Sequence, residues 1–177
     1  MKYYIAFIFN GSAARYHQKL VREVGPQFGE NKIFDSKNHS HVTLKYPFEA
    51  DSITEVEEIV KKVAKKHKKS KVIFNGFGNF RRFVAYFKSK FSAEGVNIQK
   101  ELMKSLRKLK WLKIGGRDLN WEPHSTISYG FTKKNFDNIW KYLNSLTNKE
   151  FVVYFDNITI LKKSRKYWKI YRAFKLK

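Results

Sequence analysis

Two tetrapeptides of one pattern, His41-Val42-Thr43-Leu44 and His124-Ser125-Thr126-Ile127, constrain this chain more than any other feature. Each places a histidine two residues before a threonine and ends on an aliphatic residue. Successive side chains of a β-strand point to opposite faces, so a histidine and a threonine at this spacing share one face. Two such faces turned toward each other would hold one tetrahedral anion between two imidazoles and two hydroxyls. The pattern therefore predicts two strands that supply one phosphoester site without a metal ion.

The elements around the two motifs follow the same order in each half of the chain. Apolar residues at helical spacing precede each motif, a second helical pattern follows it, and two β-rich runs come next. The first helical pattern ends at Gly25-Pro26. The expected helices cover residues 13–24, 52–69, 98–109 and 136–143, and the expected strands cover residues 1–10, 40–48, 71–80, 83–88, 124–129, 151–161 and 167–176.

This internal repeat predicts an α+β fold in which each half forms a small antiparallel sheet with helices on its outer face. The two lobes would then face each other across a cleft, and the two His-x-Thr strands would line that cleft from opposite sides. No linker rich in Gly, Ser or Pro separates the halves. We therefore expect residues 1–177 to fold as a single domain of two lobes.

The charge of the chain indicates a polyanionic partner. Lys and Arg number 37 against 15 Asp and Glu, which gives a net charge of +22. Such a surplus attracts nucleic acid, although a lysine-rich composition can also serve solubility alone. Cysteine is absent, which excludes disulfides and thiolate metal sites and fits the cytoplasm. No apolar run approaches the ~20 residues of a membrane span, and the first ten residues are typical of a strand rather than a signal peptide.

The motifs resemble those of the two-histidine (2H) phosphoesterases, and within them the RNA 2′,3′-cyclic phosphodiesterases, also called 2′-5′ RNA ligases. His41-Val42-Thr43-Leu44-Lys45 is similar to the first family motif and its following basic residue, and Pro123-His124-Ser125-Thr126-Ile127 to the second. The resemblance implies a bilobal fold with a pseudo-two-fold axis. It also implies hydrolysis of an RNA 2′,3′-cyclic phosphate end to a 2′-phosphate, with neither metal nor cofactor, by a monomer that needs no protein partner.

The resemblance further implies a role for each motif residue. His41 is the proton donor to the departing ribose oxygen, and His124 is the proton acceptor from water. These roles exchange if the reaction runs toward 2′-5′ ligation. Thr43 and Thr126 donate hydrogen bonds to the non-bridging phosphate oxygens. Lys45, four residues after His41, is expected to share the face of that histidine and to bind the phosphate.

Three alternatives remain open from the sequence. His39, His41 and His124 could form a three-histidine zinc site. The same two-histidine site could act instead on 2′,5′-linked oligonucleotides. The chain could also be a basic RNA-binding module whose histidines are incidental, with its charge concentrated over residues 61–69 and 162–166.

Overall fold

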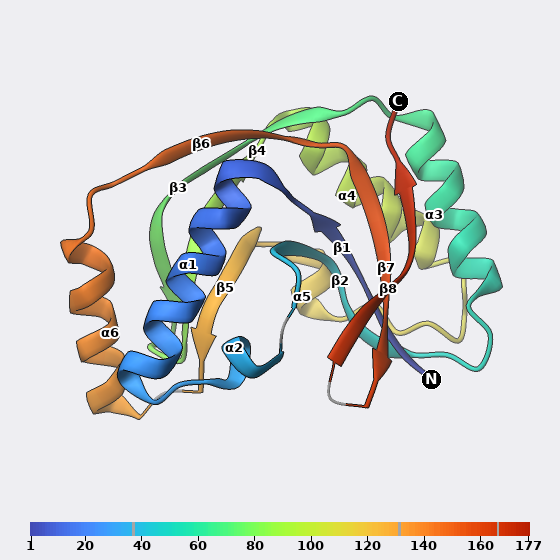
Figure 1. Cartoon of the computed structure of the whole chain (residues 1–177). Helices are drawn as coiled ribbons and strands as arrows, with labels where there is room; N and C mark the ends of the chain where they lie inside the picture. The colour runs from blue at the N-terminus through green and yellow to red at the C-terminus, as the bar shows by residue number, and fades with distance from the viewer. Residues whose placement is uncertain (37, 131, 166) are drawn as a thin grey trace.

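The computed structural model describes residues 1–36, 38–130, 132–165 and 167–177. Lys166, in the basic run 162–166, therefore lies outside the described residues. Two four-stranded sheets form its centre, and every neighbouring pair of strands is antiparallel (Figure 1). The first sheet has the order β2-β1-β7-β8, formed by His41–Glu49, Lys2–Ile8, Asn157–Ser164 and Tyr167–Lys175. The second has the order β5-β4-β3-β6, formed by His124–Tyr129, Val84–Phe91, Ser70–Phe80 and Glu150–Phe155. The expected α+β fold with antiparallel sheets is confirmed.

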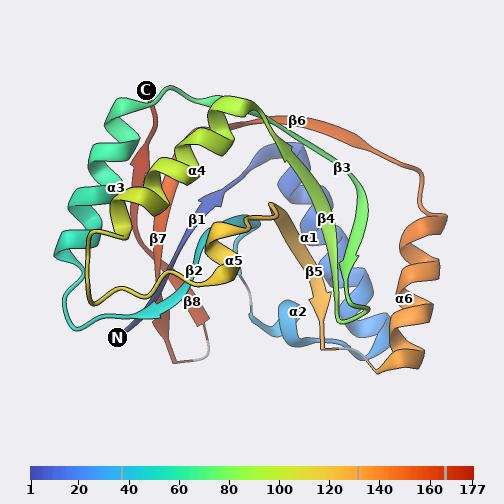
Figure 2. The same cartoon turned by 180° about the vertical axis from the view of Figure 1, so that it is seen from behind.

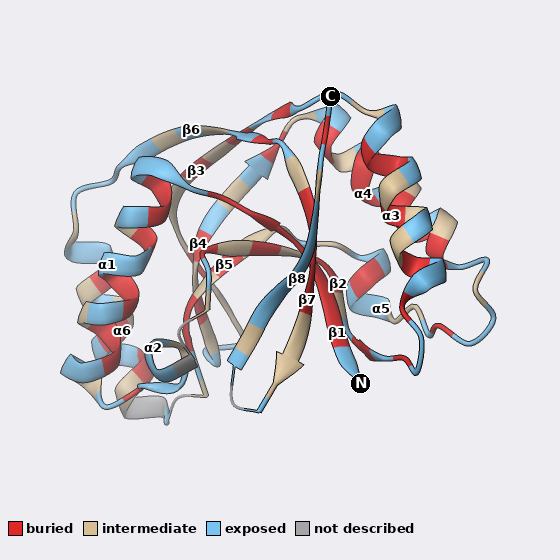
Figure 3. Cartoon of the chain, turned by 45° about the vertical axis from the view of Figure 1, so that its right-hand side comes forward, coloured by how far each residue is buried: buried red, intermediate tan, exposed pale blue. Residues whose placement is uncertain are grey.

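Helices lie at both ends of this pair of sheets (Figures 1 and 2). At one end, α1 packs against β5, β6 and α6; at the other, α3 packs against β7, β8 and α4. Their bounds are Gly11–Phe28 for α1, Thr54–Lys66 for α3, Ala93–Leu106 for α4 and Lys133–Ser145 for α6, and two short helices are α2, Lys32–Ser36, and α5, Gly116–Leu119. The helices turn their buried faces inward (Figure 3). No helix in the described part is both long and apolar enough to cross a membrane.

The first helix is longer than the sequence pattern predicted. It continues through Pro26 to Phe28 and is capped by Gly29, whose φ of +69° is the left-handed conformation that glycine adopts without strain. The aromatic ring of Phe28, in the last turn, lies 5.8 Å from the ring of Tyr142 on α6. This packing holds the last turn in place beyond the proline.

The expectation that each half of the chain forms its own sheet is wrong. Each sheet takes two strands from each half, because β3 and β4, which follow the first motif, pair with β5 and β6, while β7 and β8 pair with β1 and β2. The helix α1 likewise precedes β2 but packs on the other sheet. Local patterns predict that a strand forms but not which edge it joins, so this exchange was not visible in the sequence. It ties the two halves into one unit.

The chain passes between the sheets at Asp156, inside the run 151–161 that was expected to be one strand. The side chain of Asn157 replaces a strand neighbour there: its Oδ1 accepts from the Ile8 N–H at 3.2 Å and its Nδ2 donates to the Ile8 carbonyl at 2.7 Å. The Leu176 N–H donates to the Asp156 carbonyl at 2.8 Å. These bonds let the strand break without leaving its backbone groups unpaired.

One continuous apolar core joins the two sheets. The ring of Phe7 on β1 lies 5.1 Å from Phe155 on β6 and 6.1 Å from Phe91 on β4, so residues from both sheets pack together. A second, small cluster covers the other face of the first sheet, formed by Tyr4, Ala6, Ile8 and Leu161 with Trp168 packed against it. The two clusters mark which face of this sheet belongs to the core and which is left for a site.

A buried histidine of α1 links the two motif strands. His17 is 5 % exposed, and its Nε2 lies 3.0 Å from the carbonyl oxygen of Thr126 and 3.0 Å from the hydroxyl of Ser125. A carbonyl oxygen only accepts, so Nε2 carries the proton, and Nδ1 accepts from the hydroxyl of Ser40 at 3.0 Å. Ser40 directly precedes His41. A single neutral imidazole therefore bonds to both motif strands, and burial lowers its pKa to about 4.

The His17 network predicts a pH-dependent stability. The folded-state pKa lies below the ordinary value of 6.5, so between these values the unfolded chain binds more protons and stability falls as the pH falls. His17 should contribute a loss of about 2 kcal/mol in the free energy of unfolding between pH 7.5 and pH 5. Urea denaturation at the two pH values measures it.

The comparison variant is His17→Leu, which cannot titrate and leaves the buried polar atoms around it without their partner. It should be less stable than the wild type at pH 7.5, by about 1–3 kcal/mol, and its stability should depend less on pH. A variant of the exposed His39 controls for the loss of any one histidine. Equal pH dependence in wild type and His17→Leu would contradict this account.

Candidate active site

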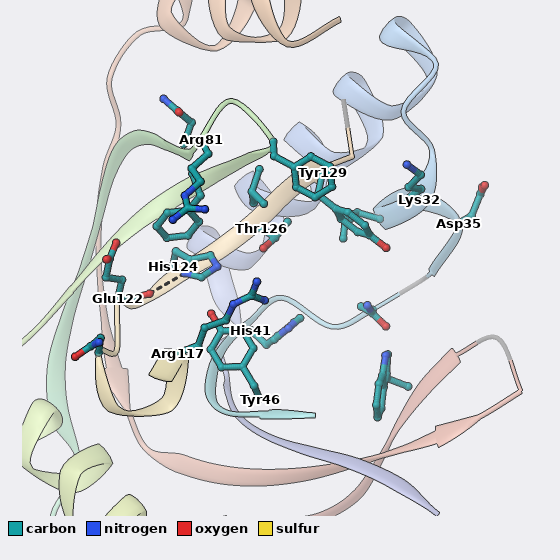
Figure 4. Close-up of a pocket in the computed structure, with 18 of the residues that line it drawn as sticks. Lys32, Asp35, His41, Tyr46, Arg81, Arg117, Glu122, His124, Thr126 and Tyr129 are labelled. Atoms are coloured by element: carbon teal, nitrogen blue, oxygen red, sulfur yellow. Dashed lines mark hydrogen bonds between the residues drawn. The ribbon is translucent and has the colours of Figure 1, made fainter. Parts of the chain in front are cut away.

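A cavity of about 1180 Å³ opens where the two motif strands meet. β2 and β5 are edge strands of different sheets and contact each other, which brings their exposed faces to one place. His41 and His124 both line the cavity, one from each strand (Figure 4). The other lining residues used below are Lys32, Asp35, Tyr46, Phe80, Arg81, Arg117, Glu122, Thr126, Lys163 and Trp168.

The two histidines are held in the same way. Nδ1 of His41 donates to the carbonyl oxygen of His39 at 2.7 Å, and Nδ1 of His124 donates to the carbonyl oxygen of Glu122 at 2.7 Å. In each case the acceptor lies two residues before the histidine. Because a carbonyl cannot donate, the proton of each neutral ring is fixed on Nδ1 and Nε2 is left with a free lone pair. Each ring can therefore accept a proton at Nε2, or donate one from it when protonated.

The surroundings of the two rings favour their neutral forms. Burial lowers the pKa of His41, and the nearby His124 lowers the same pKa further. Burial also lowers the pKa of His124, although the Glu122 carboxylate opposes this shift. The two imidazoles differ in this respect, since only His124 has the carboxylate that stabilises its protonated form.

Aromatic side chains pack against the rings of both histidines. The ring of Tyr4 lies 5.4 Å from that of His41, while Phe80 and Tyr86 lie 4.8 and 4.9 Å from that of His124. A Cβ atom on Gly78 would lie 2.5 Å from the Tyr86 ring, so only glycine admits the ring at this position. These contacts restrict the rotation of the histidines.

The two motif threonines lie on the cavity side of their strands. Thr126 is among the residues that line the cavity and Thr43 is not. Thr43 pairs with Ala6, whose side chain belongs to the cluster on the same face of the first sheet as His41. Both threonines are half-buried, and neither hydroxyl has a hydrogen-bond partner among the described residues. Thr43 is fixed through its backbone, since its carbonyl accepts from Trp121 Nε1 at 2.7 Å. Both hydroxyls are free to donate to a ligand.

Lys45 does not share the face of His41, contrary to the expectation from the sequence. The pairing of β1 with β2 shifts between Ala6, opposite Thr43, and Ile5, opposite Lys45. Ile5 is a core residue, so the shift turns Lys45 toward the core and away from the cavity. An irregularity of this kind breaks the two-residue alternation on which the expectation rested.

Lys45 instead forms a buried ion pair behind the site. Its Nζ lies 3.1 Å from Oδ2 of Asp118, and each side chain is 3 % exposed. The same carboxylate accepts from the backbone N–H of Tyr46 at 2.8 Å and of Gly115 at 2.8 Å. The start of α5 is thereby fixed against β2. Arg117, the neighbour of Asp118, lies over the Tyr46 ring at 5.8 Å, and both line the cavity.

Several residues of the site carry no signal in the sequence. In the sequence Asp118 cannot be distinguished from other acidic residues of loops. Its structural role is evident only from its contacts with Lys45 and Tyr46, which are far away in the chain. Lys32 and Arg81 could not be distinguished from the many other basic residues. His17 lies among the apolar residues of the first helical pattern, but its bonds to both motif strands depend on the tertiary structure.

The described residues provide no set of ligands for the zinc site considered above. Over residues 1–36, 38–130, 132–165 and 167–177, no three side chains of the types His, Cys, Asp and Glu lie close enough together to hold a metal ion. His39, His41 and His124 therefore do not form the three-histidine site considered above. The contact of His39 with His41 is made by its backbone carbonyl.

Comparison with known proteins agrees with this geometry. Residues 12–166 match the model of the 2′-5′ RNA ligase superfamily, and none of the curated protein sequences matches. TT0787 of Thermus thermophilus is similar in structure, with a TM-score of 0.67, 14% identity and coverage of 99% of this chain and 98% of that chain. E. coli LigT complexed with 3′-AMP gives a TM-score of 0.61 at 9% identity, covering 99% and 96%. Kluyveromyces marxianus Usb1 gives 0.52 at 12% identity, covering 99% and 98%.

At these identities the solved structures show that the fold is shared. Membership of the family is shown by the match of residues 12–166 to the family model. The match includes both motifs and extends over most of the chain. The structure places His41 and His124 in one cavity, as the resemblance of their motifs implied. The chain therefore belongs to the 2′-5′ RNA ligase superfamily, a family of two-histidine phosphoesterases.

Proposed function

We propose that this chain hydrolyses the 2′,3′-cyclic phosphate at the 3′ end of RNA to a 2′-phosphate, and that the same site carries out reversible 2′-5′ ligation when a 5′-hydroxyl takes the place of water. The observation that supports this most strongly is the matched support of the two imidazoles. Each has its Nδ1 proton bound to a carbonyl and its Nε2 free, and both line one cavity. Two such groups can act as base and acid on opposite sides of one phosphorus atom.

The proposed step uses one proton at each ring. Nε2 of His124 takes a proton from water as the water oxygen attacks phosphorus. Protonated His41 gives its Nε2 proton to O3′ as the bond between O3′ and phosphorus breaks, which leaves a 2′-phosphate and a 3′-hydroxyl. The Glu122 carboxylate favours His124 as the acceptor, because it stabilises the imidazolium that forms. In ligation a 5′-hydroxyl replaces water as the nucleophile at the same phosphorus and O3′ still departs, so, contrary to the expectation above, the two roles stay the same. They exchange in the reverse step, in which the 3′-hydroxyl attacks a 2′-5′ linkage, O5′ departs and the cyclic phosphate forms again.

The remaining groups stabilise the charge on the phosphate. The hydroxyls of Thr43 and Thr126 are free to donate to the non-bridging oxygens, where negative charge is concentrated in the transition state. Lys32, Arg81, Arg117 and Lys163 line the cavity together with two carboxylates, those of Asp35 and Glu122. This positive balance, and the net charge of +22, favour a polyanionic substrate.

A short RNA that ends in a 2′,3′-cyclic phosphate tests the proposal directly. We expect conversion to the 2′-phosphate in the presence of EDTA. His41→Ala and His124→Ala should each lower the rate by about 10²–10⁴-fold, since each removes one positioned proton transfer. His39→Ala, which keeps its backbone carbonyl, should stay active. Analysis of the products by chromatography separates the 2′- and 3′-phosphates.

Other outcomes identify the alternatives. Activity that EDTA abolishes and zinc restores would contradict the metal-independent mechanism. Cleavage of 2′,5′-linked oligonucleotides alone would keep the site and change the substrate. Salt-sensitive RNA binding without turnover of any phosphodiester would leave the basic binding module.

The pKa shifts predict an acidic optimum. Catalysis needs one imidazole neutral and the other protonated, so kcat/KM follows a bell centred between their two pKa values. Burial lowers the pKa of both His41 and His124 below the ordinary 6.5, so the maximum of kcat/KM should lie below pH 6.5. Initial rates at low substrate concentration between pH 4.5 and 8 measure it. A maximum above pH 7 would contradict the assignment of both histidines.

A further inference from the structure

The turn between β3 and β4 has an unexpected composition. Arg81 and Arg82 have φ angles of +47° and +56°, and the turn is closed by the Phe83 N–H, which donates to the Phe80 carbonyl at 2.8 Å. Positive φ at both central residues is typical of a type I′ turn, in which Asn-Gly is the preferred pair. Residues other than glycine adopt this conformation at an energetic cost, and arginine has no local interaction that offsets it.

An arginine with positive φ also occurs in the hairpin formed by β7 and β8. Apart from glycine, the residues with positive φ in the described part of the chain are Arg81, Arg82 and Arg165. Arg165 lies between β7 and β8, in the hairpin that supplies Lys163 and Trp168 to the cavity. Backbone strain of this kind persists where surrounding contacts enforce it, and it is concentrated at ligand sites.

Arg82 provides the contacts that enforce the turn. Its guanidinium pairs with the Asp137 carboxylate and lies 5.0 Å from the centre of the Phe136 ring, both on α6. Its backbone N–H donates to Oδ1 of Asn79 at 3.3 Å. With Arg82 held on α6, the preceding residue is directed to the opposite side of the turn.

Arg81 occupies that opposite side, where it lines the cavity. Its side chain has no hydrogen bond or ion pair with any described residue. It follows Phe80, whose ring packs 4.8 Å from that of His124, so its guanidinium lies on the His124 side of the site (Figure 4). The cavity volume of about 1180 Å³ exceeds the range of roughly 300–1,000 Å³ typical of small-molecule sites. There is room for more than the reacting phosphate and its own nucleoside.

We propose that Arg81 forms a second phosphate subsite, which binds the phosphodiester that joins the terminal nucleotide to the preceding one. A guanidinium suits this task because it binds phosphate through two parallel hydrogen bonds. The strained turn is retained because it presents this group beside His124. The site accordingly selects the ends of polynucleotide strands over single nucleotides. This inference rests on the proposed function, since it assumes that the reacting phosphate lies between His41 and His124.

Equilibrium binding tests the subsite without any turnover. The probes are a labelled short oligoribonucleotide that ends in a 3′-phosphate and, as competitor, 3′-AMP. Arg81→Asn should weaken binding of the oligonucleotide about tenfold, the value of one lost charged hydrogen-bond pair, and should change that of 3′-AMP less than twofold. The dependence of log affinity on log salt concentration should become less steep by about 0.7, the value for one phosphate contact on a single strand. Because asparagine tolerates positive φ, the Tm of Arg81→Asn should equal or exceed that of the wild type.

Arg165→Asn is the matched control, because it removes the same charge from the same backbone conformation at a residue that does not line the cavity. It should leave the preference for the oligonucleotide unchanged. An equal loss in Arg165→Asn, an equal loss for 3′-AMP in Arg81→Asn, or a wild type that binds both probes alike would each overturn the subsite. If the wild type hydrolyses no cyclic phosphate but shows the expected affinities, the proposed reaction fails and the subsite stands.

Discussion

The two halves of the active site depend on a shared constraint, the buried imidazole of His17. β2 and β5 belong to different sheets, so no strand ladder fixes one motif relative to the other. His17 bonds to the residue before His41 and to the residues around Thr126, with a donor on one ring nitrogen and an acceptor on the other. Only a neutral imidazole satisfies this pattern as it stands. Burial that keeps the ring neutral therefore also maintains the relation between the two motif strands.

A second buried interaction sets the position of the cavity wall. The Lys45–Asp118 pair is removed from solvent, where an ion pair adds little to stability unless its remaining hydrogen bonds are satisfied. Here they are satisfied by backbone N–H groups of β2 and of the segment at α5. The pair thus joins two segments that are distant in the chain. Its consequence for the site is the placement of Arg117 over Tyr46.

The histidines and the cations of the site meet opposite requirements. The imidazoles need partial burial and a fixed orientation. The carbonyls of residues 39 and 122 fix the orientation, and the aromatic rings packed against the imidazoles supply the burial. The cations need to remain accessible to a ligand, and the turn at Arg81 achieves this at the expense of local strain. The residues of α6 that hold this turn through Arg82 lie outside the cavity, so they enforce the strained backbone without occupying the site.

The sequence by itself determined the two His-x-Thr strands, their shared faces, most of the helices and the basic character of the chain, because these follow from two-residue and helical periodicity and from composition. The exchange of strands between the halves, the register shift that turned Lys45 to the core, and the contacts of His17 and Asp118 were decided by the tertiary structure. Periodicity reports which side of a segment is apolar. It contains no information on which edge a strand joins or where a pairing slips, since those depend on partners tens of residues away.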